Sequence, residues 1–156
     1  MGKSYQYIPA IQQPDQTACW STTMSWWSKA VPWIKNYEEI DILGMYHHLT
    51  GADGGIRFPI GFKTMLEDVR WGLRVKSVKG PSDALSVLKT GLEKGPVVCG
   101  YFDSLVGGYH AVSLYNYEKK LGSVWAMDPN GGRHVNRDFY YLFGSLTKEV
   151  MMGVIR

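Results

Sequence analysis

The arrangement of apolar residues along the chain changes at Gly95-Pro96. Before this point they recur mostly at helical spacing, which predicts one strand over 73–79 and helices over 19–30, 38–49, 59–71 and 82–94. After it, continuous and alternating apolar runs predict a short helix near 139–142, a final strand, and strands over 97–102, 110–117 and 123–127. Helices followed by antiparallel strands are typical of an α+β fold.

The size of the chain and its charge narrow the possible classes of protein. A length of 156 residues predicts a single domain spanning 1–156, and 45% hydrophobic with 20% charged residues is an ordinary globular composition. The net charge of +3 is too small to indicate a nucleic-acid partner. No apolar run is long enough to span a membrane, and the first residues lack the apolar core of a signal peptide.

Cys19 lies where a polar loop turns into a helix. Gln13 precedes Pro14 and is therefore pushed out of the helical region, whereas no glycine or proline interrupts the chain from Thr17 to Pro32. The sulfur of Cys19 is then expected in the first helical turn, where free N–H groups and the helix dipole favour an anion. A thiolate there would be a nucleophile. A small buried cysteine is the alternative, and the position alone leaves both open.

A cysteine nucleophile needs a base within hydrogen-bond reach. His47 and His48 are neighbours on a predicted helix and point in different directions, and His134 is expected to be exposed in a turn. His110 opens a predicted strand directly after Gly107-Gly108-Tyr109, where it could face another part of the fold. A core histidine on a strand is the competing interpretation.

Asp128 follows His110 by one predicted hairpin, so its carboxylate could accept from the imidazole and fix its tautomer. Asp128-Pro129 is also common turn chemistry. Acyl transfer further needs donors for an oxyanion. The N–H of Cys19 and a glutamine just upstream would supply them, but Gln12, Gln13 and Gln16 remain equal choices on chemistry alone. The cysteines and histidines show no paired ligand spacing, so we expect neither a metal nor another cofactor.

These residues together resemble papain-like cysteine peptidases, especially small bacterial forms that include plant-directed effector peptidases and bacteriocin leader-processing peptidases. The resemblance lies in Gln13 six positions before Cys19, Trp20 directly after it, the run around His110, and Asp128-Pro-Asn-Gly. It implies a two-lobe papain-like fold, with a helical lobe over about 1–95 and an antiparallel sheet lobe over about 96–156.

The resemblance also assigns roles. It implies Cys19 as nucleophile, His110 as base and later acid, Asp128 as the residue that orients the histidine, and Gln13 as the oxyanion-hole glutamine. His110 follows Cys19 more closely than the roughly 130–150 residues usual for papain. The additional cysteine that papain carries just before its nucleophile is absent, and both Cys19 and Cys99 are expected to be reduced.

The expected function is therefore that of a cysteine endopeptidase that cleaves a protein substrate through an acyl-enzyme. Kinship further implies a bacterial toxin or effector, delivered by a specialised secretion system, active in a target-cell cytoplasm and neutralised by an immunity protein. A glutamine deamidase or acyltransferase is the rival within enzymes. A catalytically inactive binding domain is the rival outside them, and neither nucleic acid nor a membrane is an expected partner.

Overall fold

The computed structural model describes residues 5–156. The helices are α1 (Cys19–Ala30), α2 (Glu39–Met45), α3 (Ile60–Leu66), α4 (Pro81–Leu92) and α5 (Phe139–Phe143). The strands are β1 (Leu73–Val78), β2 (Val97–Asp103), β3 (Gly108–Glu118), β4 (Ser123–Asp128), β5 (Arg133–Asp138) and β6 (Val150–Ile155). Short 3-10 turns cover Tyr5–Tyr7, His47–Leu49 and Val69–Trp71.

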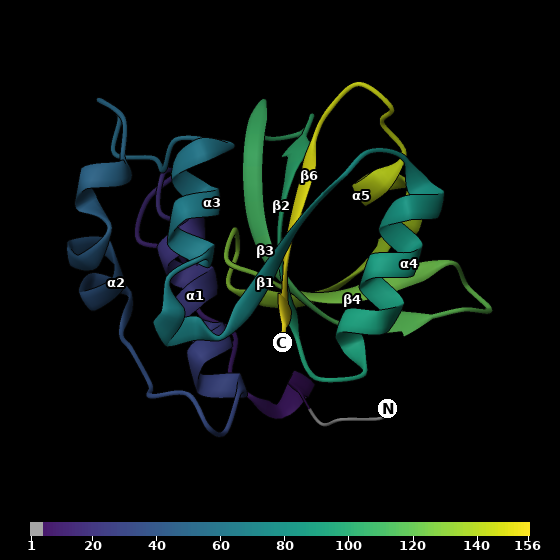
Figure 1. Cartoon of the computed structure of the whole chain (residues 1–156), viewed down its shortest axis with the longest axis horizontal. Coiled ribbons are helices and arrows are strands. Elements are labelled where there is room, and N and C mark those ends of the chain that lie inside the picture. Colours follow the sequence, from purple (N-terminus) through teal and green to yellow (C-terminus); the bar gives the residue numbers. More distant parts are fainter. Residues whose placement is uncertain (1–4) are drawn as a thin grey trace.

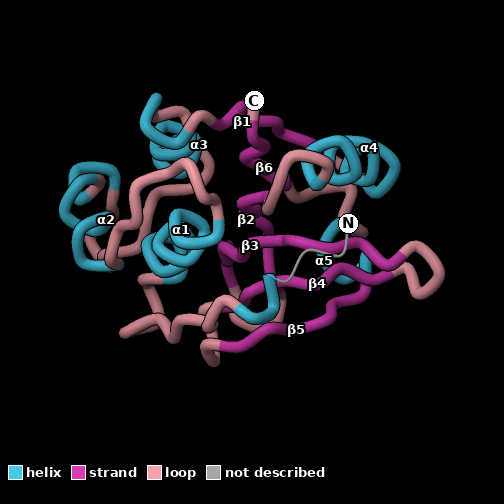
Figure 2. The backbone as a smooth tube through the Cα atoms, turned by 90° about the horizontal axis from the view of Figure 1, so that it is seen from below, coloured by secondary structure: helices cyan, strands magenta, loops and turns pink. Residues whose placement is uncertain are grey.

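One sheet of six strands in the order β1-β6-β2-β3-β4-β5 forms the centre of the fold, and every neighbouring pair is antiparallel. Helices α1 to α3 lie on one side of this sheet, and α4 and α5 lie on the other (Figure 1). Figure 2 shows the sheet curving from β1 to β5 between these two groups. The predicted α+β class is confirmed, with helices on both faces of one antiparallel sheet.

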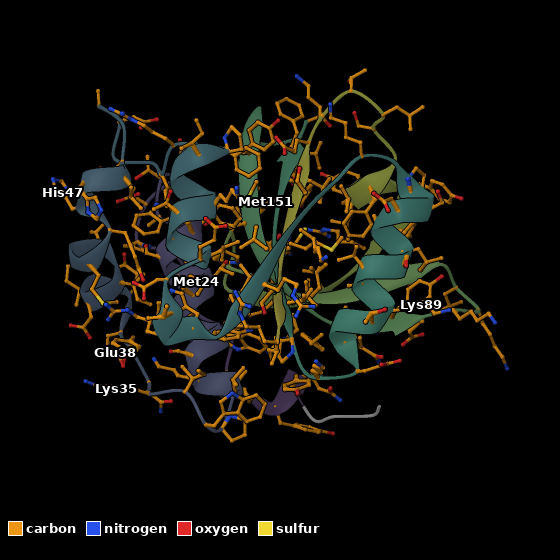
Figure 3. All side chains as sticks on the ribbon, in the orientation of Figure 1. Met24, Lys35, Glu38, His47, Lys89 and Met151 are labelled. Atoms are coloured by element: carbon orange, nitrogen blue, oxygen red, sulfur yellow. The ribbon has the colours of Figure 1, made fainter. Side chains whose placement is uncertain are left out.

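Two large apolar cores and a smaller cluster around Trp26 and Tyr115 hold the layers together. The first lies between the three N-terminal helices and the sheet and contains Trp20 and Trp27 of α1 together with Trp71. Met24 of α1 and Met151 of β6 both point into this space (Figure 3). The second core packs α4 and α5 against the opposite face of the sheet. Because Trp20 is 1% exposed, it packs the start of α1.

The sheet includes strand β1, which lies before the predicted lobe boundary near residue 96. Strand β1 pairs with β6 from Leu73↔Ile155 to Val78↔Val150, and Ala84 of α4 lies in the core on the far face. The helical part on the α1 side therefore ends at about residue 71. Pairing between strands so distant in the chain depends on tertiary packing, which a local apolar pattern does not reveal.

The structure also differs from the predicted helices in detail. The expected helix over 59–71 ends at Leu66, and Val69 beyond it is 94% exposed. The Asp68 side chain accepts from the backbone N–H of Arg70, which starts a separate 3-10 turn and directs Val69 outward. In α2, Ile42 is buried, whereas Ile40 is exposed.

Strand β5 was not predicted, since its Arg-His-Val-Asn-Arg-Asp sequence has one apolar residue. It pairs with β4 along its full length and forms an edge of the sheet. His134, expected to be exposed in a turn, is instead half-buried on this strand. Its Nδ1 lies 3.0 Å from the Tyr115 hydroxyl, and its Nε2 lies 2.9 Å from the carbonyl oxygen of Ile8.

Candidate active site

Cys19 is the first residue of α1, as predicted, and its side chain is partly exposed. The N-cap position is Ala18, whose side chain cannot accept a hydrogen bond, so no side chain caps the helix. Just upstream, the Asp15 carboxylate accepts from the backbone N–H and the hydroxyl of Thr17, at 2.8 and 2.7 Å. The loop is therefore held by its own contacts, and the first N–H groups of α1 remain available beside the sulfur.

Two hydrogen bonds fix α1 on the sheet. The Thr23 hydroxyl donates to the carbonyl oxygen of Ala111 at 3.0 Å, and the Trp27 indole N–H donates to that of Pro96 at 2.9 Å. Thr23 lies four residues after Cys19 and Ala111 directly follows His110. The helix and β3 therefore bring Cys19 and His110 to the same cavity, which both line.

His110 and Asp128 form a buried pair. The Nε2 of His110 lies 2.7 Å from Oδ1 of Asp128, and the two side chains are 4% and 5% exposed. The pairing of β3 with β4 sets them on neighbouring strands, as the sequence predicted. The backbone N–H of Asn130 also donates to Oδ1, at 2.9 Å, so the turn after β4 holds the carboxylate in place.

The surroundings of His110 favour its protonated form. Burial alone would lower its pKa, but the hydrogen bond to Asp128 and the hydrogen bond and charge of Cys19 raise the pKa of His110 to about 10. Because Nε2 faces Asp128, Nδ1 is the ring nitrogen left for Cys19. The arrangement can therefore hold an imidazolium between a carboxylate and a sulfur.

Gln13 lines the same cavity and is 8% exposed. Its Nε2 donates to the carbonyl oxygen of Asp15 at 2.8 Å, and an amide nitrogen has a second N–H to offer. Exchanging the amide oxygen and nitrogen would set two oxygens against each other at that distance, so this orientation is the favourable one. Gln12, in contrast, is exposed, and its side chain donates to the backbone of Gln13.

The cavity measures about 740 Å³ and has two apolar walls. One comes from the chain before and within α3, with Phe58 and Phe62, and the other from the β2–β3 hairpin, with Tyr109. The Phe58 and Tyr109 rings stack with centroids 3.8 Å apart. Gly100 of β2 lies against the wall formed by Phe58 and Phe62, where an added Cβ would be 2.7 Å from a ring carbon of Phe62. Polar residues, Gln16, Thr17, Asp53 and Asn130, complete the lining.

Several residues considered in the sequence lie outside the cavity. His47 is exposed at the outer side of α2 (Figure 3), His48 is exposed beside it, and His134 binds the N-terminal segment. Cys99 is 0% exposed, and burial raises the pKa of its thiol. Across residues 5–156, no three His, Cys, Asp or Glu side chains come together to hold a metal ion, and no helix is long and apolar enough to cross a membrane.

Arg137 was not singled out from the sequence. Its Nη2 lies 3.4 Å from Oδ2 of Asp128, the carboxylate oxygen that does not face His110. It belongs to β5, the strand that the apolar pattern did not predict, and no motif marks it. Knowledge of β5 would have been needed to find it.

The six-stranded antiparallel sheet, the preceding helices and the cleft containing Cys19 and His110 define the papain-like cysteine peptidase fold. Solved structures of this class superpose over nearly the whole chain. The peptidase domain of Streptococcus ComA, a bifunctional ABC transporter of a quorum-sensing pathway, has a TM-score of 0.67 at 12% identity and covers 96% of this chain and 100% of its own.

A second similar structure is a double-glycine motif protease from an AMS/PCAT transporter in complex with its leader peptide. It has a TM-score of 0.57 at 15% identity and covers 97% of this chain and 94% of its own. No protein-family model and no curated protein sequence matches the chain. At this level of identity, the likeness shows the fold.

Proposed function

We propose that this protein is a cysteine peptidase that cleaves a polypeptide through Cys19, His110 and Asp128, with Gln13 in the oxyanion hole. The observation that carries the proposal is the buried 2.7 Å hydrogen bond from His110 to Asp128 at a cavity that Cys19 also lines. A histidine that only filled the core would not need its second ring nitrogen directed toward a cavity.

In the proposed reaction, the Cys19 thiolate attacks the carbonyl carbon of a peptide bond and forms a C–S bond. The oxyanion accepts from the backbone N–H of Cys19 and from the free amide N–H of Gln13. Protonated His110 gives its proton to the leaving amine as the C–N bond breaks. His110 then takes a proton from water, which attacks the thioester and releases the acid and the thiolate.

Asp128 has a supporting role in this scheme. Its carboxylate holds the imidazole through Nε2, so that Nδ1 stays directed toward Cys19, and it stabilises the imidazolium. The carboxylate is buried and acts through His110, so it does not need to touch the substrate.

The two resemblances point to two candidate substrates. The likeness to effector peptidases extends the proposal to a protein of a target cell, with a cognate protein inhibitor as partner. The structural likeness to a protease solved with its leader peptide favours a second candidate, a peptide carrying a double-glycine motif. Synthetic double-glycine peptides and a target-cell extract, each analysed for new N-termini by mass spectrometry, distinguish the two.

The decisive experiment compares the wild-type protein with Cys19→Ala and His110→Ala. We expect new N-termini from the wild type and none from either variant, with circular dichroism unchanged. His48→Ala, an exposed histidine outside the cavity, is the matched control and should cleave normally. Undiminished cleavage by Cys19→Ala would refute the proposal, and a product of unchanged chain length would indicate deamidation.

A further inference from the structure

Asp128 places a carboxyl group in a site almost closed to water. Its side chain is 5% exposed, and an ionised carboxylate at such a place is costly unless it is paired and hydrogen-bonded. Oδ1 accepts from His110 Nε2 and from the N–H of Asn130. Among the residues that the structure describes, Oδ2 has a single hydrogen-bond donor, Arg137.

The pairing of β4 with β5 explains how Arg137 reaches this oxygen. Val124 lies opposite Arg137, and Asp128 lies opposite Arg133, so all four side chains are on one face of the hairpin. Arg133 is the nearer arginine along the strand, yet its side chain is exposed and makes no hydrogen bond to Asp128. Arg137 lies farther along β5, yet its side chain, which is 32% exposed, is the one that reaches Oδ2 of Asp128.

We propose that Arg137 is a positioning residue, which binds the outer oxygen of Asp128, balances its charge and thereby fixes the inner oxygen on His110. Arg137 is absent from the cavity lining, so it acts through Asp128 and not on the substrate. This inference rests on the proposed roles of Cys19 and His110.

The consequence concerns the acid side of the pH profile. Without the guanidinium, the buried carboxylate loses the hydrogen bond to Oδ2 and the balancing charge, so it is held less firmly against His110 and stabilises the imidazolium less. As the pH rises in such a variant, His110 would lose its proton before Cys19 does, so that Cys19 would remain a thiol. The thiolate would form only at higher pH, near the ordinary thiol midpoint of about 8.5.

Other titratable groups around His110 and Asp128 keep a single protonation state over the pH range in which these two residues are tested. They are Tyr101 and Asp103 from β2 and Tyr141 from α5. Hydrogen bonds from Tyr141, Tyr101 and the N–H of Leu105 outweigh burial and keep the pKa of Asp103 below its usual value. Burial and the bond to Asp103 raise the pKa of Tyr141 to about 12, so its hydroxyl remains neutral.

The test measures iodoacetamide labelling of Cys19 by mass spectrometry from about pH 5 to about pH 9. Buried Cys99 should stay unlabelled and so checks that the fold remains closed. We expect rapid labelling of wild type at the acid end. Arg137→Gln should label about tenfold more slowly there and approach the wild-type rate at the basic end. Arg137→Lys, which keeps the charge, should restore the acid-end rate.

Arg133→Gln is the matched control, since it removes the same charge from the same strand and face. It should label as wild type does. An Arg137→Gln profile that coincides with that of Arg133→Gln would overturn the inference. Slow labelling of the wild type itself at the acid end would instead refute the proposed Cys19–His110 pair.

A second arm covers the case in which Arg137→Gln does not fold. The neutral amide of Asp128→Asn needs no cation, so Asp128→Asn/Arg137→Gln should fold as well as Asp128→Asn does. If Arg137 acts through Asp128, the double variant and Asp128→Asn have the same labelling profile. A further tenfold difference between them would show that Arg137 acts by another route, and the inference would be wrong.

Discussion

The backbone N–H of Gln13 donates to the carbonyl oxygen of Pro129 at a distance of 3.0 Å. This bond joins the residue proposed for the oxyanion hole to the turn that begins at Asp128, the proposed orienting acid. The same turn contains Gly132, where an added Cβ would lie 2.8 Å from the backbone nitrogen of Gln12. The two ends of the site are therefore in direct backbone contact.

Gly132→Ala should disturb this contact. Gly132 has φ +57°, so alanine carries the strain of the left-handed region, and its Cβ would also push against Gln12. We expect a loss of about 1–2 kcal/mol from the strain, a further loss from the contact, and reduced turnover as Gln13 moves. Gly122→Ala, at φ +61° with no atom within 4 Å, controls for the strain alone. Equal losses in chemical denaturation would contradict the prediction.

Gln13→Ala tests the oxyanion donor. Removing one such donor lowers kcat by about 10²- to 10³-fold, and we expect this with any polypeptide that the wild type cleaves. Iodoacetamide labelling of Cys19 should remain as fast as in wild type, because the donor serves the oxyanion and not the thiolate. Gln12→Ala, an exposed neighbour, should leave kcat unchanged. A similar fall in both variants would argue against the assignment.

The raised pKa of His110 predicts a pH dependence of stability. Its folded-state pKa of about 10 exceeds the ordinary value, so folding favours the protonated ring. This contribution is complete below about pH 6 and is lost as pH rises through about 10. The difference in free energy of unfolding between wild type and His110→Gln should therefore shrink from about pH 6 to about pH 10. His48→Gln, at an exposed position, is the control variant, and a difference that grows with pH for His110→Gln would contradict the sign.

Gly100→Ala tests the close packing under the cavity. The added methyl group would lie 2.7 Å from Phe62 and 2.8 Å from Phe58, so we expect a loss of about 1–3 kcal/mol in unfolding free energy. Gly44→Ala in α2, with no atom within 4 Å, should instead stabilise by about 0.5–1 kcal/mol. Thermal denaturation of both variants checks this, and an unaffected Gly100→Ala would show that the rings move apart freely.

The parts of the fold that the sequence predicted are those with strong local signals. The loop-to-helix change at Cys19 and the apolar run of β2 appear in the structure at nearly the predicted bounds. Strand β5 was missed because its stability comes from pairing with β4, while its own sequence is mostly polar. The burial of Ile42 beside an exposed Ile40 has a similar origin, since neighbouring elements decide which face of α2 is covered.

The candidate site divides in the same way. Cys19 and His110 lie on elements with clear local signals, whereas Gln13 lies in a loop and was chosen among three glutamines by the resemblance alone. The structure places all three residues around one cavity. The register of β3 and β4 was needed to bring Asp128 to His110, and the register of β4 and β5 to bring Arg137 to Asp128. Registers depend on pairing across the sheet. Spacing could therefore suggest Asp128, one hairpin after His110, but not Arg137 on the unpredicted strand β5.

The difference in exposure between the two cysteines allows the folded fraction of the protein to be measured. Cys19 opens onto the cavity, whereas Cys99 is fully enclosed by the sheet and its neighbours. In native solution, an electrophile should therefore add once per molecule, and a second adduct should form only as the sheet opens. The ratio of singly to doubly modified chains in one mass spectrum would then give the ratio of folded to opened molecules. The substrate need not be known for this measurement.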